Sequence, residues 1–434
     1  MKKVKIALLG LGNVGRGVWM ILNSNKEEIR KRSGYDIEVA KVLVRDIKRD
    51  RGVSIPENIL TTDFNEILND DEIKIVIEVM GGIDAARDYM LKAMDKKKHI
   101  VTANKMLLAT GGDEIFEKAD SMGVMFNYEA SVAGGIPIIN GINESLTANK
   151  ILELYGIING TTNYILSKME ADGLSFDDAL AEATEKGYAE ADPSSDIEGF
   201  DAQYKLAILA SLAFGTKIDV KNVYREGITN IKAIDMEYAK EFKMVIKLLA
   251  IVKDINGKLE LRVHPTMIPK KHPLANVYDS FNAVFIKGNA VGDLMFYGRG
   301  AGDLPTGSAV VSDLISILRN NIDLENINPV VKNNLWDKKL NDIKSVQSRY
   351  YIRTTVEDKP GVLGEVTRIL GSYGVSLKSV IQRGREDEKD DKVTLVLVTH
   401  DTNESKIMSA IDEIYELEAV KKIDNIIRIE DFKN

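Results

Sequence analysis

Short apolar runs alternate with helical stretches over the first 137 residues. Four runs have the length of a strand and are followed by glycine or a polar turn. They are residues 4–9, 37–44, 73–80 and 99–102. A fifth strand is expected at residues 124–129, where the chain enters a loop of small residues. The pattern predicts one domain of strands and helices over residues 1–137.

A second domain is predicted over residues 138–299. Its strands are the apolar runs near residues 152–158, 261–268 and 283–288. Residues 206–214 form a helix too apolar to lie in water, and Gly215 ends it. A further helix at residues 310–318 follows a glycine-rich stretch. We expect residues 300–325 to complete the first domain.

The last part of the chain forms a separate unit. Residues 330–348 are polar and rich in lysine without a strong pattern, so we interpret them as a linker or an exposed helix. Residues 349–434 again alternate strands and helices. The strands are 350–356, 375–381, 393–399 and 420–429, the helices are 361–373 and 405–415, and a charged hairpin spans 383–392. This βαββαβ order predicts a ferredoxin-like sandwich.

Charge and composition restrict the partners. A chain of 434 residues should hold about two to four domains. The formal net charge of −8 argues against nucleic acid or a membrane surface as partner, because basic patches bind both. The absence of cysteine excludes disulfides, thiolate zinc sites and a cysteine nucleophile. The first residues lead directly into a strand and no apolar run has transmembrane length, so we expect a cytoplasmic protein with a small ligand.

The turn after the first strand has the spacing of a dinucleotide-binding loop. Residues 10–15 read Gly-Leu-Gly-Asn-Val-Gly between a strand and a helix. The first glycine allows a tight turn, the second the approach of a pyrophosphate, and the third close packing of helix on strand. The phosphates are expected at the helix N-terminus. The motif predicts a Rossmann-type, doubly wound nucleotide domain. Its cofactor contacts are Gly10, Gly12, Asn13, Val14 and Gly15.

The end of the second strand bears on the choice of cofactor. In NAD-binding domains an acidic residue usually ends this strand, whereas an arginine suits the 2′-phosphate of NADP. Here Arg45 is followed by Asp46. Arg45 favours NADP, with NAD as the alternative, because Asp46 lies beside it and because Arg45 can equally be an ordinary surface residue.

Two other segments are candidates for the site. Ligands of doubly wound domains bind beyond the carboxyl ends of the strands, so Thr102, Asn104 and Lys105 lie where a nicotinamide and its substrate would meet. Lys105 can also be an ordinary solvated lysine. The loop at residues 129–137 exposes carbonyl groups that can hold a hard cation, although a turn that lets two domains approach is the commoner explanation.

The most informative stretch is residues 187–205, where five carboxylates and one amine precede the apolar helix. Pro193 and the two serines after it exclude a regular helix in the acidic part. Asp201 falls near the helix N-terminus, and Lys205 lies four residues on, on the same face, where the two can pair. A buried ammonium is costly unless it is compensated. The stretch is therefore predicted to present charge to a small polar ligand; the alternative is a solvated loop that caps a core helix.

Taken together, these motifs closely resemble homoserine dehydrogenases over residues 2–319, most specifically in the run from Gly187 to Lys205. The resemblance implies that Lys205 is the proton donor and Lys105 a second active-site lysine. It also implies substrate contacts by Glu190, Asp196 and Asp201, and cofactor contacts by Thr102 and Gly302. A monovalent cation, usually sodium, would bind through Glu129, Val132, Gly134 and Ile136.

The implied reaction interconverts aspartate 4-semialdehyde and homoserine by hydride transfer. Charge develops on the carbonyl oxygen, where an ammonium can stabilise or protonate it. No covalent intermediate is needed. A semialdehyde dehydrogenase acting at the acid level usually needs a cysteine for its thioester, and this chain has none. The other alternative is a non-catalytic sensor, which would not need two lysines in one pocket.

The tail resembles an ACT domain, with its first turn at residues 358–363. Exposed edge strands of such a unit can pair between subunits. The resemblance therefore implies a homodimer or homotetramer whose activity falls when an amino acid, here threonine, binds the ACT domain.

Overall fold

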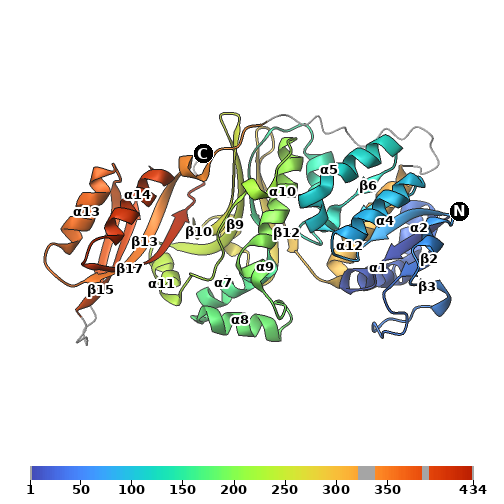
Figure 1. The fold of residues 1–434 in the computed structure, drawn as a ribbon, viewed down its shortest axis with the longest axis horizontal. Helices are drawn as coiled ribbons and strands as arrows, with labels where there is room; N and C mark the ends of the chain where they lie inside the picture. The colour runs from blue at the N-terminus through green and yellow to red at the C-terminus, as the bar shows by residue number, and fades with distance from the viewer. Residues whose placement is uncertain (1, 321–337, 384–390, 433–434) are drawn as a thin grey trace. The chain divides into compact units, whose positions relative to one another are not determined.

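The computed structural model describes residues 2–320, 338–383 and 391–432 (Figure 1). The chain forms two compact units, each built from three segments. Unit 1 comprises Met1–Gly160, Asp201–Val223 and Ser280–Asp337. Unit 2 comprises Thr161–Phe200, Tyr224–Asp279 and Lys338–Asn434.

The largest part of unit 1 is a parallel sheet in the order β3-β2-β1-β4-β5-β6. Its strands are β1 (Lys2–Leu9), β2 (Tyr35–Leu43), β3 (Leu60–Thr61), β4 (Ile73–Glu78), β5 (His99–Thr102) and β6 (Phe126–Asn127). This is the strand order of a dinucleotide-binding fold, so the predicted doubly wound domain is confirmed. The last strand is much shorter than the predicted run at residues 124–129.

Helices cover both faces of this sheet (Figure 1), because each face carries its own cluster of apolar side chains that must be buried. They are α1 (Asn13–Ser24), α2 (Lys26–Ser33), α3 (Asn65–Leu68), α4 (Asp84–Asp95), α5 (Lys105–Met122) and α12 (Asp303–Arg319). Val4, Ile6 and Leu8 point to the core shared with α1 and α12, and Ala7 and Leu9 to the core shared with α4 and α5. A strand buried on both faces therefore reads as one continuous apolar run.

The rest of unit 1 is antiparallel. Strand β11 (Phe281–Gly288) pairs on one side with β12 (Gly292–Arg299) and on the other with β7 (Ile151–Ile157). The short helix α6 (Ile138–Asn140) and the apolar helix α10 (Phe200–Phe214) complete it. Most side chains of α10 are buried, which explains why its sequence is too apolar for a surface helix.

Unit 2 begins with helices α7 (Gly160–Asp172), α8 (Phe176–Glu185) and α9 (Ser194–Ile197). A regular helix was not expected in the acidic stretch, but α9 forms a single helical turn there. Pro193 lies at the position before its first residue, where the missing N–H costs nothing because that group has no helical partner. The long strands β9 (Met244–Ile255) and β10 (Lys258–Pro269) form an antiparallel hairpin, with β8 (Tyr224–Arg225) and α11 (Ala233–Glu241) beside it.

The C-terminal part of unit 2 has the predicted βαββαβ order. Its strands are β13 (Gln347–Glu357), β14 (Leu377–Arg383), β15 (Lys392–Thr399), β16 (Thr402–Asn403) and β17 (Val420–Ile429), and its helices are α13 (Val362–Ser372) and α14 (Glu404–Tyr415). The sheet order is β17-β13-β15-β14, and one apolar core joins it to both helices (Figure 1). Part of the predicted linker, 330–337, and the hairpin tip, 384–390, lie outside the described residues.

The described part of the predicted linker, residues 338–348, contacts β10 and is not one continuous helix. Leu340 bridges to Leu259 at the start of β10, and a turn at Ile343–Ser345 leads into β13. Within the described ranges no helix combines the length and the apolar character needed to cross a membrane.

Candidate active site

The glycine-rich loop of unit 1 has the local geometry that its spacing predicts. Gly10 has a φ of 99°, and a Cβ there would lie 2.8 Å from the Cα of Met80. A Cβ on Gly15 would lie 2.3 Å from the Gly10 carbonyl oxygen, so only glycine lets α1 start this close to the turn. Nothing lies within 4 Å of a Cβ built on Gly12. This open space at the α1 N-terminus suits a pyrophosphate.

The loop lines one wall of a groove of about 1030 Å³. Asn13 belongs to the lining, and Arg45, Arg49 and Arg51 line the groove beyond the end of β2. Sequence reasoning singled out Arg45 but missed the other two arginines, although three arginines within seven residues were visible as a signal. Their charges make this end of the groove suited to a phosphate group.

The carboxyl ends of β4 and β5 are tied together beside that groove. Thr102 donates from Oγ1 to Glu78 Oε2 at 2.6 Å, and its oxygen accepts from the Asn104 backbone N–H at 3.1 Å. Asn104 accepts from the Leu107 N–H and donates to the Gly82 carbonyl. Burial raises the pKa of Glu78 against the opposing effect of the Thr102 hydroxyl. These contacts fix the start of α5, whose first residue is Lys105.

One buried carboxylate brings the two candidate lysines together. Asp201 accepts from Lys105 on Oδ1 and from Lys205 on Oδ2, the second at 2.7 Å. The exposed fractions of the side chains are 3% for Asp201, 11% for Lys205 and 41% for Lys105. The pair predicted from the four-residue spacing on α10 is therefore present, and the fold adds a second amine from α5.

Two neighbouring groups of unit 1 fix the Asp201–Lys205 pair further. Lys205 donates to the Ile158 carbonyl at 2.9 Å, and Asn159 donates from Nδ2 to Asp201 Oδ2 at 2.9 Å. Gly160 follows, and a Cβ there would lie 2.9 Å from the Ser280 carbonyl oxygen. The contacts of Ile158 and Asn159 were not predicted, because a main-chain carbonyl leaves no mark in a sequence and Asn159 reads equally well as a helix cap.

The electrostatics of Asp201 depend on its two amines. Burial by itself would raise the pKa of this carboxyl group. The attraction of Lys205 and Lys105, together with their hydrogen bonds, outweighs burial and holds the pKa well below its usual range. Asp201 is therefore a carboxylate at neutral pH.

The acidic stretch before α10 belongs to unit 2. Asp196 lies on α9 and accepts from Thr161 Oγ1 at 2.9 Å, while the same hydroxyl contacts the Tyr188 carbonyl at 2.7 Å. Glu190 is exposed and lies between α8 and α9. The run from Asn159 to Asn163 thus contains both the start of a helix, at Gly160, and a hydroxyl group that contacts Asp196.

The proposed cation loop is buried, and its carboxylate is already engaged. Glu129 accepts from the backbone N–H groups of Ile139 at 2.8 Å and Asn140 at 2.7 Å. Burial raises its pKa to about 7, and burial likewise raises the pKa of Asp313, whose carboxylate accepts from the Glu129 N–H at 2.8 Å. The described residues contain no cluster of three acidic or histidine side chains arranged for a metal.

A cation in this loop would have to be bound by main-chain carbonyl oxygens. Ala133 and Gly134 have φ values of 55° and 46°, which bend the backbone sharply between Val132 and Ile136. A Cβ on Gly134 would lie 2.5 Å from the Gly300 carbonyl oxygen, so the loop also packs against the stretch that leads to Gly302 and α12. Two buried carboxyl groups lie beside it, and a bound cation would favour their charged forms.

The ACT part of unit 2 contains a second cavity, of about 360 Å³. It is formed by the end of β13 and the turn before α13, and Gln382 of β14 also lines it. The turn is the predicted one: it contains Asp358, Lys359 and Gly361, and Gly361 has a φ of 97°.

The comparisons with known proteins agree along the whole chain. Three family models match: "Homoserine dehydrogenase, NAD binding domain" over residues 10–129, "Homoserine dehydrogenase" over 137–315 and "ACT domain" over 350–414. The homoserine dehydrogenase of a Synechocystis strain is 46% identical over 435 residues, covering 98% of this chain and 99% of the relative. The chain belongs to the homoserine dehydrogenase family.

Solved homoserine dehydrogenases have the same fold. The structure from Thiobacillus denitrificans has a TM-score of 0.93 and 42% identity, and the match covers 100% of this chain and 99% of that one. A hyperthermophilic archaeal homoserine dehydrogenase in complex with NADPH has a TM-score of 0.61 and 26% identity, over 73% of this chain and 97% of that one.

The family decides between the functional alternatives. The enzyme is an NAD(P)-dependent homoserine dehydrogenase with a C-terminal ACT domain, as the motifs implied. It is neither a semialdehyde dehydrogenase acting at the acid level nor a non-catalytic sensor.

Proposed function

We propose that Lys205 is the proton donor of this homoserine dehydrogenase and that Asp201 positions both Lys205 and Lys105. The observation that supports this most directly is the shared carboxylate, which holds two amines on either side. A proton donor must be held within reach of one oxygen atom of the substrate. Lys205 is held by Asp201 and by the Ile158 carbonyl, and these two contacts fix the place of its Nζ atom.

A bound nicotinamide would supply the hydride in the direction of homoserine. Negative charge develops on the aldehyde oxygen during the reduction, and the Lys205 ammonium donates its proton to that oxygen. Lys105 adds a second positive charge at the strand end where that ring is expected to lie. In the reverse direction Lys205 accepts the proton of the alcohol.

We assign the substrate's α-ammonium to Glu190 and Asp196. Both are carboxylates of the acidic stretch, and the Thr161 hydroxyl already orients Asp196 at 2.9 Å. An α-ammonium offers three donors, which suits a site with more than one carboxylate acceptor. The chain position of both residues, shortly before α10, supports the assignment.

NADP is proposed as the preferred cofactor. Arg45 lines the groove together with Arg49 and Arg51, so the 2′-phosphate would meet several guanidinium groups. The NADPH complex of the archaeal relative supports this choice. NAD remains the alternative, because Asp46 also lines the groove.

A monovalent cation, sodium by preference, is proposed to bind the carbonyl groups of Glu129, Val132, Gly134 and Ile136. Its role would be structural, because it would offset the buried charge of Glu129 and Asp313 and hold the loop that packs against Gly300. No step of the reaction is assigned to it.

Threonine is proposed as an inhibitor that binds the ACT cavity beside Asp358. The cavity of about 360 Å³ is large enough for a free amino acid. A homodimer or homotetramer is proposed to form through the ACT domain, because β14 is the edge strand of its described sheet and exposes Val380.

One experiment tests these assignments together. Oxidation of NADPH and of NADH is followed by the loss of their absorbance with aspartate semialdehyde as substrate, with and without added amino acids. We expect turnover with both nucleotides, a lower KM for NADPH, and a loss of rate with threonine. Equal KM values for NADPH and NADH would contradict the proposed contact of Arg45 with the 2′-phosphate. Rates that no amino acid changes would contradict the proposed inhibition through the ACT domain.

A further inference from the structure

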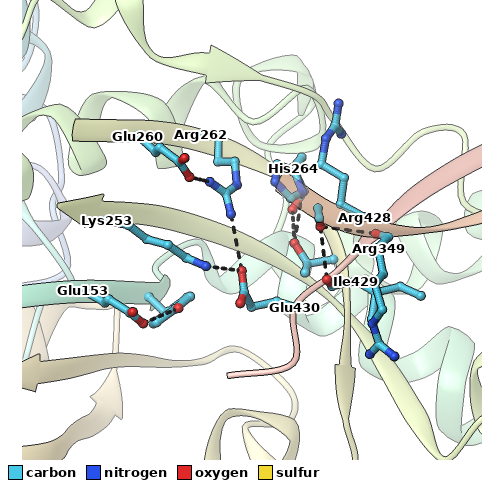
Figure 2. A network of polar contacts seen from close by, with 12 residues as sticks. Glu153, Lys253, Glu260, Arg262, His264, Arg349, Arg428, Ile429 and Glu430 are labelled. Atoms are coloured by element: carbon cyan, nitrogen blue, oxygen red, sulfur yellow. Dashed lines mark hydrogen bonds and ion pairs between the residues drawn. The ribbon is translucent and has the colours of Figure 1, made fainter. Parts of the chain in front are cut away.

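The ACT domain of unit 2 continues the sheet formed by β9 and β10. Strand β17 runs parallel to β10, with Arg428 opposite Thr266 and Ile429 opposite Met267. Figure 2 shows the polar contacts at this junction: Lys253 and Arg262 both point at Glu430, at 2.7 Å and 3.3 Å, and Arg262 also contacts Glu260. A junction of buried, paired charges is costly to open and therefore moves as one piece.

Arg428 is the central residue of this junction. Only 3% of it is exposed, although it carries a charge at the end of a sheet strand. Its Nε donates to Glu404 of α14 at 2.9 Å, and Nη1 donates to both carboxylate oxygens of Glu226 at 3.0 Å. Nη2 also contacts the Tyr224 hydroxyl at 3.0 Å. One guanidinium group thus joins an ACT helix to a segment outside the ACT domain.

That segment, residues 224–241, is called the connecting segment here. Two further ACT residues hold it. Asp235 on α11 accepts from Arg353 of β13 at 2.8 Å and from Asn425 of β17 at 2.9 Å. Asn425 also donates to the Asn230 carbonyl at 3.2 Å. The connecting segment is therefore attached to the ACT sheet at several points along its length.

The other side of the connecting segment contacts the turn before α10. Ile228 donates its N–H to the Ile197 carbonyl at 2.8 Å, and Arg225 donates to the Glu198 carbonyl. The Arg225 guanidinium lies 3.5 Å from the centre of the Phe200 ring. Phe200 is the first residue of α10, the helix that carries Asp201 and Lys205.

The packing at this contact leaves little free space. A Cβ on Gly227 would lie 2.4 Å from the Ile197 carbonyl oxygen, so the two backbones touch. A displacement of the connecting segment must therefore displace the turn at residues 197–200 as well, because close-packed backbone cannot absorb it.

The ACT cavity lies at the far end of the same strands. Glu357, which lines the cavity, donates its N–H to the Ala419 carbonyl just before β17. From there β17 runs beside β13, with Val420 opposite Val356 and Arg428 opposite Tyr350. Two paired strands thus link the cavity to the Arg428 junction.

We propose that the connecting segment couples the ACT domain to the turn at residues 197–200, and that the ion pair of Arg428 with Glu226 carries this coupling. The proposal rests on the proposed feedback through the ACT cavity. It adds the route: the cavity, the β13–β17 pair, Arg428, Glu226, and then Arg225 and Ile228 against the start of α10.

The test compares Glu226→Gln with Glu237→Gln in the full-length enzyme. Glu226→Gln removes the charge that Arg428 contacts and keeps the shape of the side chain. Glu237 is exposed on α11 of the same connecting segment and serves as the matched control. Kinetics with and without threonine, threonine binding by calorimetry, and hydrogen–deuterium exchange of residues 194–200 are measured for each.

For Glu226→Gln we expect kcat and KM within about twofold of wild type without threonine, and an unchanged Kd for threonine. The inhibition at saturating threonine should fall to less than half of the wild-type value, because the ion pair that carries the coupling is lost. Allosteric coupling of typical size changes affinity by only about 5- to 150-fold. Exchange of residues 194–200 should become faster. Glu237→Gln should match wild type in every measurement.

Several outcomes separate the proposal from the feedback on which it rests. Full inhibition of Glu226→Gln with unchanged exchange would overturn the route while leaving feedback intact. If no amino acid inhibits the wild type, the proposal of feedback is wrong, and exchange then decides whether the ion pair holds the turn. Faster exchange at residues 194–200 in Glu226→Gln supports this, and unchanged exchange overturns it. A lower affinity for threonine would show that Glu226 acts on the cavity and would also overturn the route.

Discussion

Asp201 and Lys205 lie one turn apart on α10, and the Oδ2 and Nζ atoms of their side chains are 2.7 Å apart. The other oxygen of Asp201 accepts from Lys105 on a different helix. One carboxylate therefore fixes the distance between two amines that are 100 residues apart in the sequence. Each of the three side chains can be removed separately, which makes the arrangement testable.

Lys205→Ala should lower kcat by a factor of about 10² to 10⁴, the range for the loss of a positioned proton donor. Binding of the nucleotide, measured by fluorescence, should stay close to wild type. Lys217→Ala, an exposed lysine after the same helix, is the control and should keep full activity. A kcat near the wild-type value in Lys205→Ala would rule out this role.

Lys105→Ala should also reduce kcat severely, and unlike Lys205→Ala it should raise KM for the nucleotide. The reason is its position at the end of β5, where the nicotinamide is expected. Initial rates at varied nucleotide and fixed aspartate semialdehyde measure both constants. The same KM in both lysine variants would place Lys105 away from the ring.

Asp201→Asn should destabilise the fold by about 3 kcal/mol, the lower end for a broken buried pair, because Lys105 is partly exposed and screened. The low pKa of Asp201 stabilises the folded state above the unfolded value near 3.8, and this contribution is lost as the pH falls below about 4. Urea unfolding at pH 6 and pH 3.5 measures it. The gap between wild type and variant should shrink at pH 3.5, and a constant gap would contradict the prediction.

Arg45→Ala should weaken NADPH binding by about 10- to 100-fold and leave NADH nearly unchanged, because a charge-assisted phosphate contact is lost. Lys48→Ala, in the same loop but outside the groove lining, is the control. Arg49→Ala and Arg51→Ala should have smaller effects of the same sign. Equal losses for NADPH and NADH would show that Arg45 does not distinguish them.

Sodium should raise the thermal stability more at pH 8 than at pH 5.5. Burial raises the pKa of Glu129 to about 7, so without a cation the folded state loses stability as the pH rises from about 4.5 to 7. A bound cation favours the carboxylate and removes this loss. Melting curves in sodium chloride and in choline chloride at equal ionic strength test it. Identical Tm values in both salts would argue against the cation.

Threonine inhibition should be lost in Asp358→Ala and kept in Asp412→Ala, an exposed carboxylate on α14. Shortening the chain near Ser348 to remove the ACT domain would be a poor test. It would remove β17 from β10 and leave Glu226 and Asp235 without their arginine partners. Binding and inhibition are therefore best measured on point variants, and equal inhibition of Asp358→Ala would place threonine elsewhere.

The elements with strong periodicity were predictable from sequence. Strands β1, β5 and β17 and the βαββαβ order follow from apolar runs and turn residues, and the Asp201–Lys205 pair follows from helix geometry alone. The two sides of such a pair are on one helix, so no knowledge of the tertiary fold is needed to bring them together.

Contacts between distant segments were not predictable in this way. The Lys105 amine reaches Asp201 only because β5 and α10 are brought together by the fold of unit 1. Arg428 and Asp235 each read as ordinary surface charges in the sequence, yet both are nearly fully buried. The pattern of charge along a chain does not show which charges will be covered, because the cover comes from other segments.

Helix α12 packs against α1 so closely that a Cβ on Gly307 would lie 2.7 Å from the Gly17 carbonyl carbon. Val310, Leu314 and Ile317 of α12 fill the core on the α1 face of the parallel sheet. A ribosome that has completed β1 to β6 has therefore not yet made the helix that covers this face. The nascent chain must carry an open apolar surface through the synthesis of about half of unit 2, and exposed apolar surface of this kind is what chaperones protect during translation.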